Sequence, residues 1–264
     1  QFNSLTHLIP DKYKPFYEIW NITVIEDQVF FQTYRRIFRY DGQSMHVVEV
    51  FGRSDELKIS TAFNYRDEYF FIAPGKGLFT LKDDTLARVE LSRELPRKVE
   101  TIAQFKGPEF IVVGGDRLYT LNMVSRQVSR YKTSIDAYFE ENQLYKGLTR
   151  VGSYLLVGTS MGGVVILDGE GQVVEIIDQE DGLTTGSVYR LKMDRSNNLW
   201  VASSNGIARV DLSSPITFWD RRNGLRGYVA DILRQGERLY LSTENGIHYL
   251  EEGLIHRFGD YKEQ

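Results

Sequence analysis

The chain has 264 residues, of which 42% are apolar and 26% charged, and this balance is that of an ordinary globular protein. Its formal net charge of −4 argues against a nucleic-acid-binding surface, which needs a basic stripe, so we expect no nucleic acid as a partner. No run of about 18 apolar residues occurs, so we expect no membrane contact by this segment. The absence of cysteine excludes disulfides, thiolate metal ligands and cysteine nucleophiles.

Short apolar runs separated by small polar turns recur along the chain. In each repeat the second run carries a large apolar or aromatic residue that serves as a marker. The markers are Phe30, Phe71, Ile111, Leu156, Trp200 and Tyr240. They lie 41, 40, 45, 44 and 40 residues apart, and a period of about 40–45 residues with four strands per repeat is typical of a β-propeller blade. We therefore predict an all-β chain that folds as a β-propeller of four-stranded antiparallel blades.

In chain order, residues 1–20 precede the first full repeat, and we expect them to supply outer strands that close the ring or to form a partial blade. Six blades follow, at approximately 21–52, 56–94, 99–131, 148–177, 187–219 and 230–258. No proline-rich linker or low-complexity stretch interrupts them. We therefore predict a single propeller domain over residues 1–264.

The fifth repeat has the clearest turns. Asn205-Gly206 between two β-rich runs predicts a type I′ hairpin turn, in which both central residues need a positive φ. Because propeller blades pack face to face, we expect the Trp200 ring to lie between blades. We interpret the following residues as turn formers: Asp194, Asn205, Gly206, Asn245 and Gly246.

The same repeat reads D-x-x-x-N-L-W-V-A-x-x-N-G-I-x-x-V from Asp194 to Val210, flanked by Asp181-Gly182-Leu183 and Asn223-Gly224-Leu225. The fourth and sixth repeats have Val157-Gly158-Thr159 and Leu241-Ser242-Thr243 in the matching place. These residues resemble the repeat of the two-component regulator propeller family. The first three repeats lack the Asp turn and the Leu-Trp pair.

The resemblance implies a periplasmic or extracellular sensor propeller of a bacterial hybrid signalling protein, ahead of a small β-sandwich, a membrane helix and a cytoplasmic output module. Such a domain would bind a small-molecule or glycan ligand and signal to the downstream module, and a homodimer through the parent protein is left open. The family's ring commonly has about seven blades, whereas six fill this chain. That difference implies that the chain is a fragment or that residues 1–20 help to complete a final blade.

Antiparallel order puts the turns between second and third strands on the same face as the links between blades. Loops on a rigid scaffold usually carry recognition, so we expect the ligand on this turn-and-link face. Arg35 and Arg36 can hold an anion bidentately or form a solvated pair, and Tyr138 and Tyr145, in a long acidic link over 134–147, can stack on a sugar or pack the link. The ligand-binding candidates are Arg35, Arg36, Lys76, Tyr138, Asn142, Tyr145, Met161, Asn205, Tyr228 and Glu244.

Catalysis finds little support in the sequence. His7, His46, His248 and His256 lie far apart and have no metal-ligand spacing, so we predict no enzyme activity, no catalytic residue, no metal and no cofactor. Three functions stay open: a ligand sensor, which we favour, a protein-interaction scaffold, and a propeller lyase or glycosidase. The scaffold would need a broad exposed apolar patch on one face, and the enzyme would need His46 or His248 beside two carboxylates.

Overall fold

A computed structural model divides the chain into two compact units, residues 1–212 (unit 1) and residues 213–264 (unit 2). The described residues are 4–14, 18–50, 58–82, 84–212, 225, 227–236, 238–251 and 254–257. In this part of the chain no helix combines the length and the apolar character that crossing a membrane requires. The predicted last strand of the fifth blade (213–219) and Asn223-Gly224 lie outside the described residues. The prediction of one domain over 1–264 stays a prediction.

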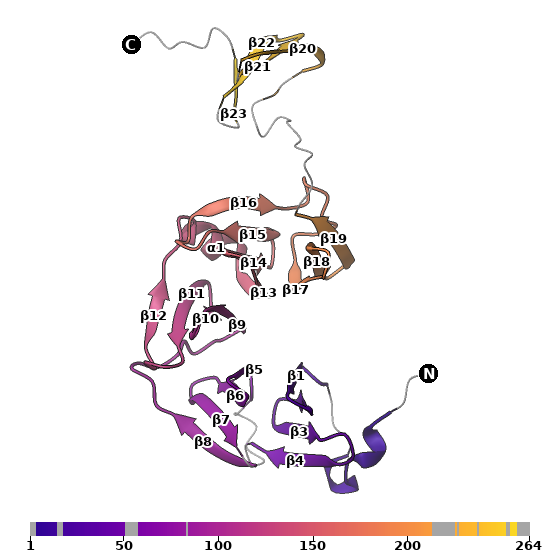
Figure 1. The fold of residues 1–264 in the computed structure, drawn as a ribbon, viewed down its shortest axis with the longest axis vertical. Coiled ribbons are helices and arrows are strands. Elements are labelled where there is room, and N and C mark those ends of the chain that lie inside the picture. The colour runs from indigo at the N-terminus through magenta and orange to yellow at the C-terminus, as the bar shows by residue number, and fades with distance from the viewer. Residues whose placement is uncertain are drawn as a thin grey trace. The chain divides into compact units, whose positions relative to one another are not determined.

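Unit 1 contains five antiparallel sheets, each a meander of consecutive strands (Figure 1). Blade 1 consists of β1 (Asn21–Ile25), β2 (Gln28–Gln32), β3 (Arg36–Tyr40) and β4 (Met45–Glu49). Blade 2 consists of β5 (Thr61–Tyr65), β6 (Glu68–Ala73), β7 (Gly77–Lys82) and β8 (Thr85–Val89). Blade 3 consists of β9 (Thr101–Lys106), β10 (Glu109–Gly114), β11 (Arg117–Asn122) and β12 (Val128–Tyr131).

Blade 4 consists of β13 (Leu144–Val151), β14 (Tyr154–Thr159), β15 (Val164–Leu167) and β16 (Val173–Ile177). Blade 5, within the described residues, consists of β17 (Val188–Met193), β18 (Asn198–Ser203) and β19 (Gly206–Asp211). Short helices lie outside the sheets: η1 (Thr6–Leu8) and η2 (Asp11–Tyr13) before blade 1, and α1 (Asp136–Asn142) between blades 3 and 4. Unit 2 is one further meander, of β20 (Val229–Gln235), β21 (Arg238–Thr243), β22 (Gly246–Glu251) and β23 (Leu254–Arg257).

These sheets confirm the predicted fold, a β-propeller of four-stranded antiparallel blades. Every marker residue lies in the second strand of its blade. Ile111 of β10, for example, pairs with Ala103 of β9 and with Thr120 of β11. The 40–45-residue period is therefore the spacing between equivalent strands. In unit 1, Figure 1 shows the first strands on the inside of the row of blades and the fourth strands on the outside.

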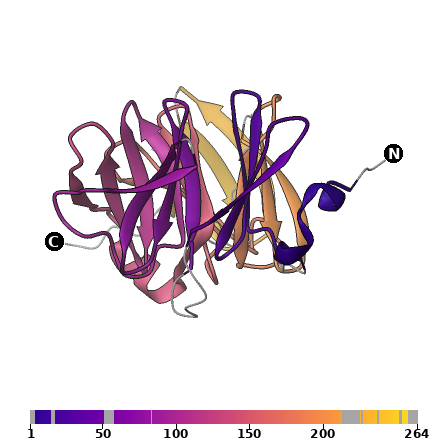
Figure 2. The same cartoon turned by 90° about the horizontal axis from the view of Figure 1, so that it is seen from below.

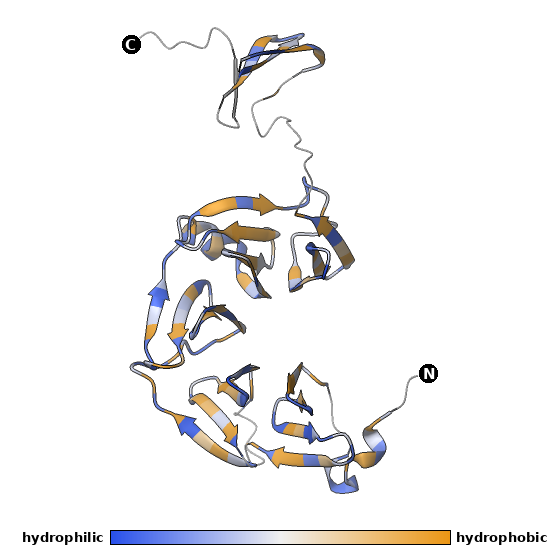
Figure 3. Cartoon of the chain, viewed as in Figure 1, coloured by the Kyte–Doolittle hydropathy of each residue, from blue (hydrophilic) through white to orange (hydrophobic). Residues whose placement is uncertain are grey.

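The core of unit 1 lies between successive blades. The ring centroids of Phe30 on β2 and Tyr69 on β6 are 4.7 Å apart, and those of Phe63 on β5 and Phe110 on β10 are 4.9 Å apart. Phe110 is 2% exposed and Ile111 not at all, so β10 buries both of its faces. Burial of each such side chain contributes about 1.5–3 kcal/mol, which explains the continuous apolar runs of the second strands. Figure 3 shows apolar residues gathered on the strands and polar residues on many of the turns.

The strands run between two faces of the unit (Figure 2). On the turn-and-link face, a hydroxyl at the end of the second strand closes the turn to the third. Thr159 Oγ1 donates to the Gly163 carbonyl over 3.0 Å, and Ser203 Oγ donates to the Gly206 carbonyl over 3.1 Å. Thr243 makes the same bond to Gly246 in unit 2, over 3.1 Å. This bond explains why these repeats have a serine or threonine at the end of the second strand.

The structure corrects one detail of the fifth repeat. Ser203 pairs with Gly206, so Ser204 and Asn205 are the central residues of the turn, and of the turn residues only Gly206 has a positive φ, +124°. A type I′ turn needs two such residues, so that prediction is wrong. Leu199 and Val201 pack against blade 4, so Trp200 between them lies on the other face of β18, where its indole Nε1 donates to Asp194 Oδ2 over 2.9 Å. Its place between two blades stays a prediction.

Candidate functional site

Aromatic rings and lysines from four blades meet on the turn-and-link face of unit 1. We call this set the aromatic–lysine cluster: Trp20, Tyr34, Lys58, Tyr145, Lys146 and Tyr189. Its members are joined by ring contacts in an unbroken series, from Lys58 beside blade 2, through blade 1, to blades 4 and 5. All except Tyr34 lie within three residues of the start of a first strand. The cluster therefore lies where the innermost strands begin, at the mouth of the propeller's centre.

Lys146 joins blade 4 to blade 1. Its Nζ lies 4.9 Å from the centroid of the Trp20 ring and 5.8 Å from that of Tyr145. Trp20 in turn contacts Tyr34, with centroids 4.9 Å apart, and Lys58 Nζ lies 4.9 Å from the centroid of the Tyr34 ring. Ammonium groups over aromatic faces are attracted by the ring quadrupole, so these contacts hold the two lysines in place.

Irregular pairing in the first strands positions the residues from blades 4 and 5. On β13 the register with β14 shifts between Leu144 and Leu148, across Tyr145 and Lys146. On β17 it shifts between Val188 and Arg190, across Tyr189. A bulge of this kind re-aims side chains and interrupts the ladder, and bulges are over-represented beside functional sites. The rings of Tyr145 and Tyr189 lie 5.5 Å apart as a result.

Burial and nearby negative charge shape the electrostatics of the cluster. Burial, followed by the Glu18 carboxylate, raises the pKa of the Tyr34 phenol, so this ring stays neutral and keeps its O–H donor. Trp20 Nε1 is buried and makes no hydrogen bond within the described residues. A buried donor without an acceptor costs free energy, which a ligand oxygen could recover. The cluster thus offers ring faces for stacking, two ammonium groups for an anion and one unused N–H.

The predicted ligand residues fall in several places. Only Tyr145 belongs to the cluster. Arg36 is held locally, with its guanidinium 5.3 Å from the centroid of the Tyr13 ring and its Nε 3.8 Å from Glu49 Oε1, and Arg35 lies in the adjoining β2–β3 turn. Asn205 lies in the β18–β19 turn. Tyr228 and Glu244 belong to unit 2, where the Glu244 N–H donates to the Tyr228 carbonyl over 3.3 Å.

Three other candidates, Tyr138, Asn142 and Met161, lie close together at blade 4. The Tyr138 hydroxyl donates to the Gly162 carbonyl over 2.8 Å, beside Met161, and Asn142 Nδ2 donates to the Tyr138 carbonyl over 3.1 Å. A Cβ on Gly162 would meet the side-chain ends of Tyr138 and Asn142, so any larger residue there would have to displace them. These contacts fasten α1 to the β14–β15 turn, and burial raises the pKa of the Tyr138 phenol. A ligand role for these residues stays a prediction.

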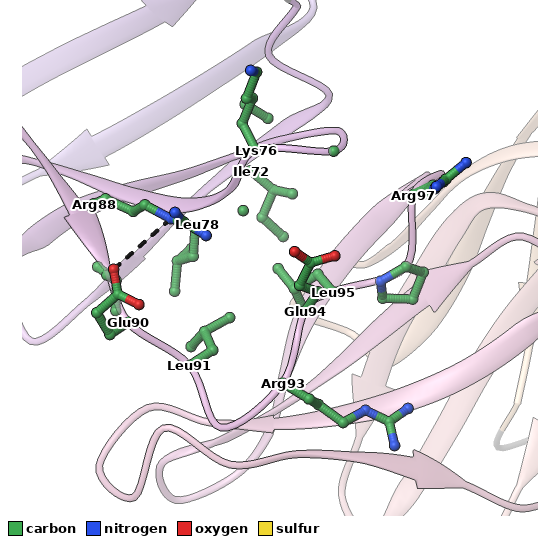
Figure 4. A pocket seen from close by; sticks show the side chains of 15 residues that line it. Ile72, Lys76, Leu78, Arg88, Glu90, Leu91, Arg93, Glu94, Leu95 and Arg97 are labelled. Carbon is green, nitrogen blue, oxygen red and sulfur yellow. Dashed lines mark ion pairs between the residues drawn. The ribbon is translucent and has the colours of Figure 1, made fainter.

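Lys76 borders a separate pocket of about 160 Å³ on blade 2 (Figure 4). Its walls include Ile72 and Leu78, which are buried, and the link that leads to blade 3. In Figure 4, Arg88 and Glu94 face the middle of the pocket from opposite sides, whereas Lys76 extends away from it. Arg88 Nε lies 4.0 Å from Glu90 Oε1, a loose ion pair between two exposed side chains. This pocket is a weaker candidate than the cluster.

The residues that we interpreted as turn formers lie in turns of the structure. Asp194 accepts hydrogen bonds from the backbone N–H groups of Ser196 (2.8 Å) and Asn198 (2.9 Å). These bonds and the one from Trp200 lower the pKa of the Asp194 carboxyl to about 2. Gly246, like Gly206, has a positive φ, +127°, and Asn245 lies in the turn before it.

Neither histidine that catalysis would need lies beside two carboxylates in the described contacts. His46 Nε2 lies 3.1 Å from Asp41 Oδ2, and His248 Nδ1 lies 3.4 Å from the Thr243 hydroxyl. Over the described ranges, no group of three or more His, Asp or Glu residues could hold a metal ion.

Five residues of the cluster were not among the ligand-binding candidates chosen from the sequence: Trp20, Tyr34, Lys58, Lys146 and Tyr189. Their shared signal is position, because an aromatic residue or lysine recurs near the start of the first strand of several blades. The bulges that bring them together have no marker in the sequence.

No protein-family model matches the sequence, and no curated protein matches it either. Among solved structures, it is similar to the extracellular domain of a putative one-component system from B. thetaiotaomicron, with a TM-score of 0.59 and 14% identity over 92% of this chain and 36% of that one. This chain therefore has the same fold as that extracellular domain. A second structure of that extracellular domain, described as that of a putative hybrid two-component system, gives a TM-score of 0.58 at 15% identity, over 91% of this chain and 35% of that one. This chain therefore spans about a third of the length of these sensor-protein domains.

Two other neighbours have different functions. Virginiamycin B lyase from Staphylococcus aureus has a TM-score of 0.52 and 13% identity, over 92% of this chain and 84% of that one. A structure of YCF48 bound to a D1 peptide has a TM-score of 0.55 and 12% identity, over 92% of this chain and 81% of that one. At these identities the likeness establishes the fold, and function has to be argued from the site.

Proposed function

We propose that this chain is a ligand-sensing propeller domain of a bacterial signal-transduction protein, placed in the periplasm or outside the cell. Its ligand is a small molecule or oligosaccharide that combines a flat face with an anionic group, and it binds at the aromatic–lysine cluster. Binding is passed to a downstream module of the parent protein. The fold shared with extracellular domains of sensor proteins supports this assignment, as does the resemblance of the fifth repeat.

One observation carries the ligand class: Lys146 Nζ lies between the Trp20 ring of blade 1 and the Tyr145 ring of blade 4, on the turn-and-link face. Sugar rings and other flat ligands stack on aromatic faces, and an ammonium beside those faces pairs with a carboxylate or phosphate. A ligand bound there would contact blades 1 and 4 at once. Because it would bridge blades that are far apart in the sequence, its binding could change how they are held, which a sensor requires.

The test is a thermal-shift and calorimetric comparison of galacturonate oligomers with neutral galactose oligomers of equal length. A bound probe at 100 times its Kd should stabilise the native protein by about 2.7 kcal/mol. Lys146→Gln removes the ammonium and should weaken binding of the acidic oligomers about tenfold or more, since a hydrogen bond to a charged group contributes about 1.5–3 kcal/mol.

The matched control is Lys106→Gln, the same change at an exposed lysine at the end of β9 on the opposite face. It should leave binding unchanged. Equal affinities of the two variants, or no stabilisation by any acidic or neutral oligomer, would contradict the proposed site.

A protein-interaction scaffold is the second candidate, because a fold neighbour was determined with a bound peptide. A scaffold would bind an extended peptide with no preference for acidic sugars. Peptide-array binding that Lys146→Gln leaves intact, together with no response to any sugar, would favour this alternative.

A further inference from the structure

The face opposite the aromatic–lysine cluster contains a cavity of about 260 Å³ between blades 1 and 2. Its floor is the stacked pair Phe30 and Tyr69, from the second strands of the two blades. Its rim consists of the β1–β2, β5–β6 and β7–β8 turns. The volume is below the roughly 300–1,000 Å³ of pockets for drug-sized ligands, so it suits a molecule of monosaccharide size.

Two buried donors at this cavity have no acceptor. Tyr69 is 1% exposed, and its hydroxyl makes no hydrogen bond within the described residues. The second donor is Nε of Arg39, which is buried and also unpaired. The other guanidinium nitrogens of Arg39 are engaged, with Nη2 2.8 Å from Asp84 Oδ2 and Nη1 3.4 Å from Gln28 Oε1. Buried polar groups are nearly always paired in native proteins, so two orphans on one cavity point to a ligand that accepts from them.

The charge of the cavity excludes an anion as that ligand. Four carboxylates line it, against the two cations Arg39 and Lys82, and Arg39 is already paired with Asp84. The remaining acidic groups, Glu26, Asp67 and Glu68, accept hydrogen bonds. A ligand that satisfies both sets needs groups that accept on one side and donate on the other. A hydroxyl does both, so the complement of this site is a neutral polyol.

The turns around the cavity retain acidic side chains at a backbone cost. Glu26 has a φ of +50° and Asp67 a φ of +60°, in the left-handed region that favours glycine. The first position of the β5–β6 turn is Arg66, also with a positive φ, +48°, whereas the first position of the same turn is Gly107 (+55°) in blade 3 and Gly152 (+58°) in blade 4. Blades 1 and 2 thus keep side chains where blades 3 and 4 have glycine.

We propose that this cavity is a second ligand site, which binds a neutral sugar of one ring through Tyr69, Arg39 and the acidic turns. It is separate from the site of the proposed function in face, charge and ligand. The sugar lies over the Phe30–Tyr69 floor, accepts hydrogen bonds from the Tyr69 hydroxyl and Arg39 Nε, and donates to the carboxylates.

Saturation-transfer NMR on the full chain with D-glucose, D-galactose and D-mannose tests this proposal, with D-galacturonate as the anionic counterpart of galactose. At least one hexose should bind. In the Lys146→Gln variant, in which anion binding at the aromatic–lysine cluster is weakened, galacturonate should bind more weakly than galactose. Tyr69→Phe removes only the hydroxyl and should weaken hexose binding about tenfold. Tyr154→Phe, at an exposed tyrosine on β14, should match the native chain.

A stability measurement separates binding from structure. Tyr69→Phe should melt at the native temperature or above in the absence of sugar, because the hydroxyl it removes has no partner. Asp67→Asn keeps the size of an exposed turn residue and provides a second variant, which should also weaken hexose binding. Lys146→Gln should leave hexose binding unchanged, which distinguishes this site from the aromatic–lysine cluster. No binding by any hexose, tighter binding of galacturonate than of galactose by Lys146→Gln, or native affinity in Tyr69→Phe would overturn the proposal.

Discussion

The two faces of unit 1 use the ends of the same strands in different ways. On the turn-and-link face, side chains reach across blades, as in the contact between Lys146 and Trp20. On the opposite face, some acidic residues close their own turns. Asp41 accepts from the backbone N–H groups of Ser44 (2.7 Å) and Gln43 (2.9 Å), and Asp194 does the same in blade 5. On the first face these side chains connect blades, whereas each of these two aspartates stabilises the turn in which it lies.

This difference follows from the lengths of the connections. Several of the two- to five-residue hairpin turns on the opposite face, such as those that begin at Asp41, Asp168 and Asp194, are closed by the side chain of their own first residue. The links on the other face have to pass from the outer strand of one blade to the inner strand of the next, and they deliver their side chains to the centre. Neighbouring elements also meet on the opposite face. Arg39 of blade 1 pairs with Asp84 of blade 2, and the Ser134 N–H of the link before blade 4 donates to the Gly171 carbonyl of the β15–β16 turn over 3.0 Å.

The largest effect is expected in the interior that supports both faces. Ile111→Ala, in the fully buried β10, should lower the free energy of unfolding by about 2–5 kcal/mol, because it removes packed methyl groups and leaves a cavity. Ile111→Val, the matched control, should cost about 0.5–1.5 kcal/mol. Urea unfolding measures both. A cost for the alanine variant no greater than that for valine would show that β10 does not lie between packed blades.

An intermediate effect is expected at the self-contained turns. The backbone N–H of Asn198 and the Trp200 indole hold the pKa of Asp194 at about 2, against an ordinary 3.8. A lowered pKa means that the charged form stabilises the fold, so this contribution is present above about pH 4 and lost as the pH falls towards 2. Asp194→Asn should therefore melt below the native chain at pH 6, and the gap should close near pH 2.

Asp41, whose pKa is also about 2, extends this test to blade 1. Asp41→Asn should behave like Asp194→Asn, and the double variant should show the sum of the two losses because each turn is separate. A gap that persists unchanged at pH 2, or a double variant no less stable than either single one, would break the comparison between the faces.

The smallest effect is expected at the edge of the aromatic–lysine cluster. Lys58→Gln removes the ammonium over Tyr34 and should cost about 0.5–1 kcal/mol, the usual contribution of an exposed cation–π pair. Lys76→Gln makes the same change on the same face at a lysine that lies over no ring in the described residues, and it should be neutral. Equal losses in the two variants would mean that net charge, rather than the ring contact, is responsible.

The sequence predicted the blades well because each blade is formed by residues that are close together along the chain. The burial of both faces of β6, β10 and β14 gives continuous apolar runs, and the equivalent strand recurs every 40–45 residues. The β18–β19 turn shows where that reasoning fails. Asn205-Gly206 predicts a type I′ turn, yet Ser204 and Asn205 are its central residues and only Gly206 has a positive φ. A residue pattern specifies where a turn lies but not its backbone conformation.

The amino-acid order was enough to establish the repeat, its turns and the all-β propeller architecture, since alternating apolar runs and turn residues are short-range properties of a chain. Only the tertiary structure shows that Lys146 lies beside Trp20, 126 positions away in the sequence. Only it shows that Tyr69 and Arg39, each with an unpaired buried donor, line one cavity. Contacts of that kind depend on the curvature of the row of blades and on two bulges in the innermost strands. Both arise from packing between sheets, which a linear pattern of residue types does not record.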